Sequence, residues 1–436
     1  MPLDFVLQPF CQSITNYFAV HTIEKGVVLM RKILTVLVMC IVILTSNDVA
    51  LARWEYDVLD LPSNIINNQT PIKIAIIDSG VIDSDYLRPY MAQGYNFIDS
   101  NTDTTDNHGH GTKITGIMVD LAKETGLNVQ LIPLKVFDTD GIAPVANVLM
   151  AIDYATRQNV DVINISLVGY NLSQEYIDVL SDAIKHNIPV VAGVGNNGKN
   201  EYLYPSSYKG VISAGSINQG KENSWFSNYN DKIDVVSPGE DVTVMNLDGS
   251  YKLHYGTSYS TSFTTFEIAL LKSYYPNLSV DEITKIVDET AIDKGEVGYD
   301  VYYGNGIINY KNAIDSAEKA FDKYSDWETH SGVQLDKSWT IKFNDAVKTI
   351  GEVYIMDEYY NIIPTDILIE ENKVTVTPST NYEEDTIYSL IIKNTVSLVD
   401  ATLKDNIRMK FKTIGKTKIM NVPTNTDVDK MPLIIP

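Results

Sequence analysis

The fold is decided by Pro71-Ile72-Lys73-Ile74-Ala75-Ile76-Ile77, which runs into Asp78-Ser79-Gly80. The run is almost continuously apolar, which is typical of a parallel strand that is buried on both faces of its sheet. In open α/β sheets, catalytic and ligand-binding groups gather at the carboxyl ends of the strands. Asp78 is therefore a candidate site residue, although an aspartate in this position also caps helices and forms turns.

Further apolar runs and amphipathic stretches alternate along the chain after this strand. Strands are predicted at residues 131–137, 160–167, 188–194, 211–215 and 233–237. Helices are predicted at residues 146–158, 175–186 and 280–289. Two more are predicted to start at about Gly111 and at Ser258, and a short one to end at about residue 320. This alternation predicts an α/β domain with a parallel sheet that is flanked by helices on both faces.

Two histidines stand in the stretch His108-Gly109-His110-Gly111-Thr112. Apolar residues at helical spacing predict a helix from about Gly111, which places His110 at its N-terminus. These apolar residues are Ile114, Ile117, Met118 and Leu121. Two histidines this close could bind a metal, but no third ligand follows at a suitable spacing, so no metal site is predicted. A purely structural role for His110 stays open.

A serine stands at the start of another predicted helix, in the stretch Tyr255-Gly256-Thr257-Ser258. Unpaired backbone N–H groups at a helix N-terminus create a positive field that favours negative charge. Serine is also one of the residues that cap helices most often, so Ser258 has a capping role as its alternative.

Four stretches together resemble the subtilisin-like serine peptidases, the S8 family, over residues 53 to about 320. They are Ile76-Ile77-Asp78-Ser79-Gly80, His110-Gly111-Thr112 with Gly116 after it, Gly195-Asn196-Asn197-Gly198, and Gly256-Thr257-Ser258. The resemblance implies that Asp78, His110 and Ser258 are catalytic, in the chain order known for subtilisin. It also implies an oxyanion role for Asn196, and substrate binding by Ser166, Leu167, Val168 and Gly195.

The chain departs from the family pattern in three places. Val168 stands where a glycine is usual, which predicts a narrowed or reshaped specificity pocket. The stretch from Tyr259 to Phe263 replaces small residues and a proline, which puts packing after the serine in doubt. The segment between His110 and residue 131 is too short for the loop of the family's best-known calcium site. No cofactor is therefore predicted, and calcium at another, unidentified site stays open.

The expected function is that of a secreted serine endopeptidase, which cleaves peptide bonds through an acyl-enzyme on Ser258. One alternative is a protease of narrow specificity that processes a leader peptide or a surface protein. Another is a catalytically inactive protein of the same fold that binds peptides or cell-wall components. All four catalytic positions are filled, which favours an enzyme.

The pattern changes after about residue 327, where period-two alternation replaces helical spacing. Short strands are predicted at residues 339–343, 353–356, 374–377, 389–392 and 408–413. They predict a small all-β sandwich over residues 328–414, after a linker at 321–327 and before a tail at 415–436. Trp339-Thr340-Ile341-Lys342-Phe343 and Lys410-Phe411-Lys412-Thr413 resemble bacterial Ig-like domains of S-layer and cell-surface proteins. Such a domain acts as a spacer or contacts the cell wall or surface.

The N-terminal part carries a predicted signal peptide at residues 30–52. Basic Arg31-Lys32, an apolar run at residues 33–44 and the small-x-small Ala50-Leu51-Ala52 support it, with a membrane anchor as the alternative. Residues 1–29 then form an upstream extension, with Met30 as the start. The two cysteines, Cys11 and Cys40, precede the cleavage point, so the mature chain has no thiol nucleophile.

Composition narrows the expected partners. The chain is globular in character, with 44% hydrophobic and 21% charged residues. Its formal net charge of −22 disfavours nucleic acids and anionic membranes, because like charges repel. The expected partner is a peptide or protein substrate, without a membrane partner once the signal is cleaved, and the expected location is extracellular or on a bacterial cell surface.

Overall fold

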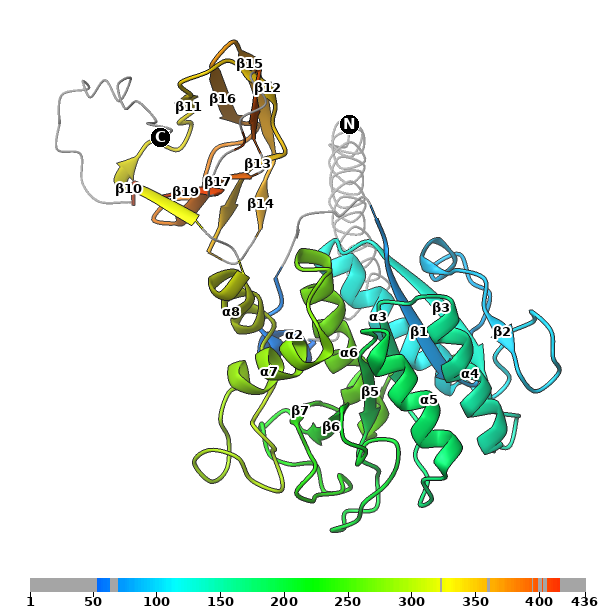
Figure 1. The fold of residues 1–436 in the computed structure, drawn as a ribbon. Coiled ribbons are helices and arrows are strands. Elements are labelled where there is room, and N and C mark those ends of the chain that lie inside the picture. The colour runs from blue at the N-terminus through cyan, green and yellow to red at the C-terminus, as the bar shows by residue number, and fades with distance from the viewer. Residues whose placement is uncertain are drawn as a thin grey trace, which may run out of the picture. The chain divides into compact units, whose positions relative to one another are not determined.

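The computed structural model describes residues 53–62, 70–321, 324–358, 361–393, 395–398, 402 and 406–415 (Figure 1). The predicted extension at 1–29, the signal peptide at 30–52 and all but the first residue of the predicted tail lie outside the described residues. Within the described ranges, no helix is both long enough and apolar enough to cross a membrane.

A seven-stranded sheet forms the centre of the first part of the chain. Its strands lie in the order β2-β3-β1-β4-β5-β6-β7, and every neighbouring pair is parallel. The strands are β1 (Ile72–Asp78), β2 (Tyr95–Asn96), β3 (Val129–Lys135), β4 (Val162–Ile165), β5 (Val190–Gly193), β6 (Val211–Ile217) and β7 (Val235–Pro238). The predicted parallel sheet is confirmed; β2, which has only two residues, was not predicted.

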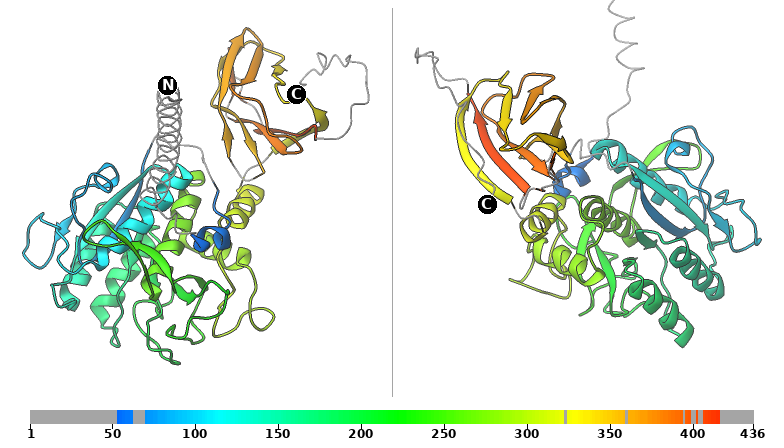
Figure 2. Two further views of the ribbon diagram at one scale, coloured as in Figure 1. Left: turned by 180° about the vertical axis from the view of Figure 1, so that it is seen from behind. Right: turned by 45° about the horizontal axis from the view of Figure 1, so that its top comes forward.

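Helices cover both faces of this sheet, as Figures 1 and 2 show from three directions. The described helices of this part are α2 (Trp54–Leu59), the 3-10 turn η2 (Arg88–Tyr90), α3 (His110–Thr125), α4 (Val145–Arg157), α5 (Gln174–Lys185), α6 (Thr257–Tyr274), α7 (Val280–Thr290) and α8 (Tyr310–Phe321). Alternate residues of β1 separate the two layers. Ile74 and Ile76 pack with α3 and α6, whereas Ala75 and Ile77 pack with α4 and α5.

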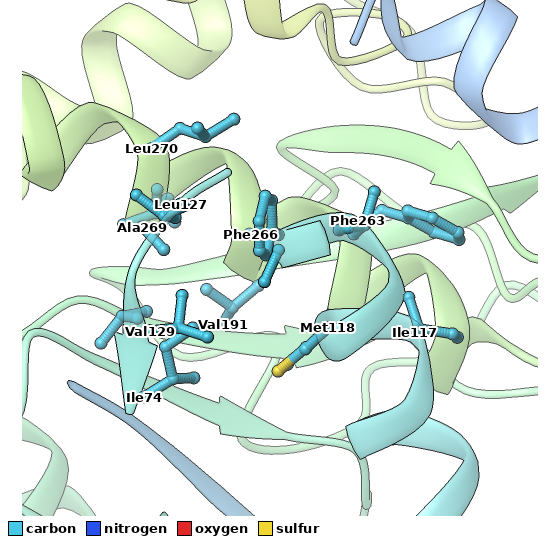
Figure 3. Packing of buried hydrophobic residues seen from close by; sticks show 14 of the residues in the cluster. Ile74, Ile117, Met118, Leu127, Val129, Val191, Phe263, Phe266, Ala269 and Leu270 are labelled. Carbon is cyan, nitrogen blue, oxygen red and sulfur yellow. The ribbon is translucent and has the colours of Figure 1, made fainter. Parts of the chain in front are cut away.

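Helix α6 is buried nearly all round, because it lies between the sheet and the helices α3 and α8. Phe263, Phe266 and Leu270 are each at most 1% exposed, and they pack with Met118 of α3 and Val191 of β5 (Figure 3). Burying a side chain of this size stabilises a fold by roughly 1.5–3 kcal/mol. The helix that carries Ser258 is therefore fixed along most of its length.

The C-terminal part is rich in strands and has its own core. A five-stranded sheet has the order β10-β19-β17-β13-β14, a three-stranded sheet the order β11-β16-β15, and β12 pairs with β18. Their bounds are β10 (Tyr324–Val333), β11 (Trp339–Lys342), β12 (Val347–Thr349), β13 (Glu352–Asp357), β14 (Ile362–Ile363), β15 (Thr365–Glu370), β16 (Lys373–Pro378), β17 (Ile387–Lys393), β18 (Val396–Ser397) and β19 (Asn406–Thr413). The predicted all-β character is confirmed, and β10 already begins at Tyr324, inside the expected linker.

Candidate active site

The site lies where the sheet order places the ends of β1 and β4 side by side. β1 has β3 on one side and β4 on the other, so the loops after β1 and β4 leave the same edge of the sheet together. Asp78 is the last residue of β1, and Ser166 directly follows β4. This edge is the usual place for catalytic groups in a parallel sheet.

Asp78 and His110 are in direct contact. Nδ1 of His110 lies 2.8 Å from Oδ1 and 2.9 Å from Oδ2 of Asp78. Asp78 is only 1% exposed, and its Oδ1 also accepts a hydrogen bond from the backbone N–H of Ser79 at 2.7 Å. Because a carboxylate only accepts hydrogen bonds, the proton of the imidazole lies on Nδ1, which leaves Nε2 free to act as a base.

His110 is held at the start of α3 by a network that sequence reasoning missed. Asp106 is 4% exposed, and its two oxygens accept from the backbone N–H groups of His108, Gly109 and Thr112 and from the Thr112 hydroxyl. The Ser79 hydroxyl donates to Asp106 at 2.9 Å. The sequence signal that could have predicted this role is the position of Asp106, an acidic residue shortly before the start of a helix.

Gly111 brings α3 close to the end of β1. A Cβ added at this position would lie 2.2 Å from the carbonyl oxygen of Gly80. The backbone N–H of Gly111 donates to the Ser79 hydroxyl at 2.8 Å. Only glycine allows this approach, which explains the residue after His110.

Opposing effects set the pKa of His110. Burial lowers the pKa, whereas the charge of Asp78 and the hydrogen bond to it raise it. Lys113 lowers the pKa and Asp106 raises it, with smaller effects. The net result is a pKa of His110 above the ordinary value for histidine, because the paired carboxylate favours the charged form.

Ser258 is the second residue of α6 and is partly exposed. Its hydroxyl donates to the carbonyl oxygen of Ser166 at 3.3 Å, and the Ser166 hydroxyl donates to the carbonyl oxygen of Ser258 at 3.3 Å. Among the described residues, Ser166 is the one hydrogen-bond partner of the Ser258 hydroxyl, so Ser258 and His110 are not hydrogen-bonded to each other. Catalytic hydrogen bonds are often long or misaligned before substrate binds and tighten in the complex.

Asn196 is tied to the residue that precedes Ser258. Its Oδ1 accepts from the backbone N–H of Thr257 at 2.9 Å and from the Thr257 hydroxyl at 3.0 Å. The same hydroxyl accepts from the backbone N–H of Gly195 at 3.2 Å. Since a backbone N–H can only donate, the amide oxygen of Asn196 is fixed, and its NH₂ group is left to donate from an exposed residue.

The four expected substrate-binding residues line two neighbouring strand ends. Ser166, Leu167 and Val168 follow β4, and Gly195 follows β5, which pairs with β4. Exposure rises along the first segment from buried Ser166 to Val168, which is 40% exposed. Gly195 is buried, with a positive φ of 101°.

Aromatic rings lie close to the His110 ring. The ring centroids of Phe137 and Tyr259 lie 6.0 and 6.4 Å away, both at interplanar angles below 30°. Tyr259 is 4% exposed, and the four residues after it are all 1% exposed or less. The expected doubt about packing after Ser258 is resolved, because this unusual segment is part of the core.

The sequence profile of the subtilase family matches residues 69–306 of this chain. The chain belongs to this family. Subtilases are serine endopeptidases, which cleave peptides or proteins, and this chain is a subtilisin-like serine endopeptidase. No cofactor takes part in the catalysis of this family.

Two curated relatives place this subtilase within the family. It is 31% identical over 251 residues to subtilisin DY of Bacillus licheniformis, which covers 56% of this chain and 90% of the relative. It is 29% identical over 274 residues to the minor extracellular protease Epr of Bacillus subtilis strain 168, which covers 61% of this chain but only 42% of Epr.

Solved structures agree with this assignment. A lanthipeptide protease has 26% identity and a TM-score of 0.52, over 56% of this chain and 88% of that one. A cold-adapted subtilisin-like serine proteinase has 23% identity and a TM-score of 0.50, over 59% of this chain and 96% of that one, and it supports the fold alone.

Proposed function

We propose that Ser258, His110 and Asp78 form the catalytic triad of this subtilase. A serine hydroxyl is a poor nucleophile at neutral pH and needs a base within hydrogen-bond reach. Nε2 of His110 accepts the Ser258 proton as the serine attacks the peptide carbonyl, and it then returns the proton to the leaving amine. Asp78 holds the imidazole in the required tautomer and stabilises the imidazolium. Water then attacks the acyl-enzyme with His110 again as the base, which releases the acyl part of the substrate and restores the Ser258 hydroxyl.

Asn196 and the backbone N–H of Ser258 stabilise the tetrahedral oxyanion in this proposal. The amide oxygen of Asn196 is occupied by Thr257, so its NH₂ group is the part that faces a substrate. The N-terminus of α6 adds the field of its unpaired N–H groups. Donors that are oriented before the reaction stabilise developing charge without a cost of reorganisation.

The single observation that carries the proposal is the contact of Nδ1 of His110 with both oxygens of buried Asp78. A fluorophosphonate probe tests it, because the probe reacts with an activated serine. We expect rapid labelling of the wild type, none of Ser258→Ala, and strongly slowed labelling of His110→Ala. Equal labelling of wild type and Ser258→Ala would exclude Ser258 as the nucleophile. No labelling of a folded wild type would instead support an inactive, peptide-binding protein.

A protease of narrow specificity is the second candidate. Val168 is 40% exposed in the segment where the acyl part of a substrate is proposed to bind, together with Ser166, Leu167 and Gly195. A valine where the family usually has a glycine is expected to narrow that groove. The similarity to a lanthipeptide protease supports a processing role. A peptide library decides between the candidates. Cleavage at many unrelated sequences supports a general endopeptidase, whereas cleavage of one motif supports a processing enzyme.

We further propose that the protein acts outside the cell or on a bacterial surface, after removal of a signal peptide at residues 30–52. The relative named as an extracellular protease supports this location. The peptidase domain is assigned to residues 53–320 and an Ig-like domain to about 328–414, as a spacer or as a contact to the cell wall. N-terminal sequencing of the exported protein tests the cleavage after Ala52, and a pull-down with purified cell walls tests the contact.

Metal binding is the remaining question for this site. In the described ranges, no group of three or more His, Cys, Asp or Glu side chains is arranged to hold a metal ion. We therefore assign no metal ligand, and calcium at another site stays a proposal. Thermal unfolding with and without a chelator tests it, because a bound ion stabilises the folded state.

A further inference from the structure

A β-hairpin that the catalytic scheme does not use lies along α3. It is formed by β8 (Val242–Met245) and β9 (Tyr251–His254). The hydroxyl of Tyr251 donates to Asp120 of α3 at 2.9 Å. The hairpin also packs closely on two glycines at α3. A Cβ added to Gly116 would lie 3.0 Å from Met245, and one added to Gly109 would lie 3.1 Å from Leu247. The hairpin is therefore fixed to α3, and its last residue, His254, comes four residues before Ser258.

Three cationic or basic side chains gather where this hairpin meets the start of α3. Lys113 lies one turn after His110, on the same side of the helix. Lys252 and His254 are alternate residues of β9 and so lie on the same face of that strand. Burial lowers the pKa of His254, and so do the nearby charges of Lys113, Lys252 and His110. Each of these charges therefore acts at His254.

These three side chains are not neutralised by carboxylates. Within the part of the chain that the structure describes, none of the three forms an ion pair; Lys113 donates only to the carbonyl oxygen of Gly109, at 3.2 Å. Asp248 acts on Lys252 only weakly: hydrogen bonds from Ser250 are the main cause of the lowered pKa of Asp248, and the charge of Lys252 is a smaller one. Asp78 and Asp106 act on His110. In a chain with a net charge of −22, an unpaired basic cluster beside a catalytic histidine is a local exception that attracts anionic groups.

The cluster and the groove that is proposed for the acyl part of the substrate are built from different elements. That groove follows β4 and β5, whereas the three side chains come from α3 and β9. The Tyr259 ring is a neighbour of both histidines, with its centroid 6.4 Å from the ring of His110 and 6.4 Å from that of His254. Because His110 passes its proton to the leaving amine in the proposed mechanism, groups beside His110 are candidates for contact with the part of the peptide that leaves.

We propose that Lys113, Lys252 and His254 form a subsite for an acidic side chain, Asp or Glu, in the leaving part of the substrate. The inference rests on the proposed triad and names the class of peptide that this triad prefers. Lys252 is exposed and Lys113 is partly exposed, and the attraction of their ammonium groups for a substrate carboxylate acts on the approach and orientation of the peptide. Salt screens this attraction. His254, whose pKa is lowered, contributes an N–H donor in place of a charge.

The test uses the full chain and a set of quenched fluorescent peptides that differ at one position. Glu, Gln or Lys is placed at the first or second residue after the cleaved bond. We expect kcat/KM to be about five- to tenfold higher for Glu than for Lys, with a smaller ratio at high salt. The ratio falls in Lys113→Gln and is lost or reversed in Lys252→Glu. Lys285→Glu, an exposed change of equal charge on α7, leaves the ratio unchanged.

The outcomes separate this inference from the proposed function. If the fluorophosphonate probe labels Ser258 but Glu and Lys peptides are cleaved at equal rates, the subsite is wrong and the triad stands. A Glu preference that Lys252→Glu leaves unchanged, or one confined to residues before the cleaved bond, also contradicts the subsite. If the probe does not label Ser258, fluorescence anisotropy of the same peptides on Ser258→Ala still tests the subsite, with tighter binding of the Glu peptide as the expected result.

Discussion

The amide oxygen of Asn196 accepts two hydrogen bonds from Thr257, one from its backbone N–H at 2.9 Å and one from its hydroxyl at 3.0 Å. The pair connects the end of β5 to the first residue of α6. It therefore orients the NH₂ group of Asn196 relative to Ser258 before any substrate arrives. The proposed oxyanion donor depends on a threonine as well as on an asparagine.

Asn196→Ala should lower kcat by about 10²–10³ with little change in KM, the magnitude known for the corresponding change in subtilisin. Thr257→Val should also lower kcat, by a smaller factor of roughly ten, because it removes one of the two bonds that orient Asn196. Steady-state kinetics on one peptide measures both. Thr284→Val on α7 is a matched control, since its hydroxyl only bonds within its own helix. An equal loss in the control, or a loss confined to KM, would contradict the role of Thr257.

Tyr259 should support both the fold and the catalytic histidine. It is 4% exposed and its ring lies against that of His110, so Tyr259→Ala should cost about 3–5 kcal/mol of stability and also lower kcat/KM. Tyr259→Phe keeps the ring and should retain most of the activity. Tyr176→Ala, a loss of a buried ring in α5, is the control: it should destabilise to a similar degree without changing kcat/KM of the folded enzyme. Equal kcat/KM in Tyr259→Ala and wild type would show that the ring does not position His110.

Much of the fold and the candidate site could be predicted because long, regular patterns carry them. The apolar run that ends at Asp78 and the helical spacing after His110 are local signals that tertiary contacts do not override. The hairpin of β8 and β9 was missed because each strand has only four residues and β9 carries Lys252 and His254. Short polar strands are defined by their partner and not by their own sequence.

The supporting residues of the site were harder to predict for the same reason. Asp106 and Ser79 are ordinary turn residues in the sequence, and their role appears only when α3 and the end of β1 come together. From the sequence, the bulky Tyr259 puts the packing after Ser258 in doubt. The sequence does not show that His110 and the hydrophobic core leave space for a side chain of this size. Packing between distant segments decided both cases.

The pH dependence of catalysis should follow His110, whose pKa Asp78 raises and Lys113 lowers. The neutral imidazole is the base, so kcat/KM falls as the pH drops through the pKa of His110. Lys113→Gln removes a positive charge that opposes protonation, so the pKa rises further and the acidic limb moves to higher pH. A peptide with uncharged residues after the cleaved bond keeps substrate charge out of the measurement.

Lys123→Gln is the matched control for Lys113→Gln. It lies near the other end of α3, where its ammonium group is 4.2 Å from the centre of the Tyr86 ring. The acidic limb of this variant should coincide with that of the wild type. A shift of the Lys113→Gln limb to lower pH would show that Lys113 acts on His110 by something other than its charge.

Stability at alkaline pH should be limited by Glu267, a carboxylate in the middle of α6. The side chain is 0% exposed, and neither of its oxygens has a hydrogen-bond partner of normal geometry among the described residues. Burial raises its pKa to about 8. The backbone N–H of Asn309 lowers the pKa and the charge of Asp288 raises it, both with smaller effects. Between the ordinary value of 4.5 and about 8, the folded chain keeps a proton that the unfolded chain releases. The free energy of unfolding therefore falls as the pH rises through this window.

The amide side chain in Glu267→Gln cannot ionise. The variant should therefore not show the fall in the free energy of unfolding that Glu267 causes at higher pH. Each pKa unit corresponds to about 1.4 kcal/mol, so the stability of the variant relative to wild type should rise by roughly 4 kcal/mol between pH 5 and pH 9. Denaturant unfolding at both pH values measures the change, and the comparison cancels the parallel contribution of Asp288, whose raised pKa of about 7 is present in both proteins. Glu124→Gln, an exposed change on α3, should track the wild type at both pH values. If Glu267→Gln also tracks it, Glu267 holds no extra proton in the folded state, and an ionised partner must stabilise it inside the core.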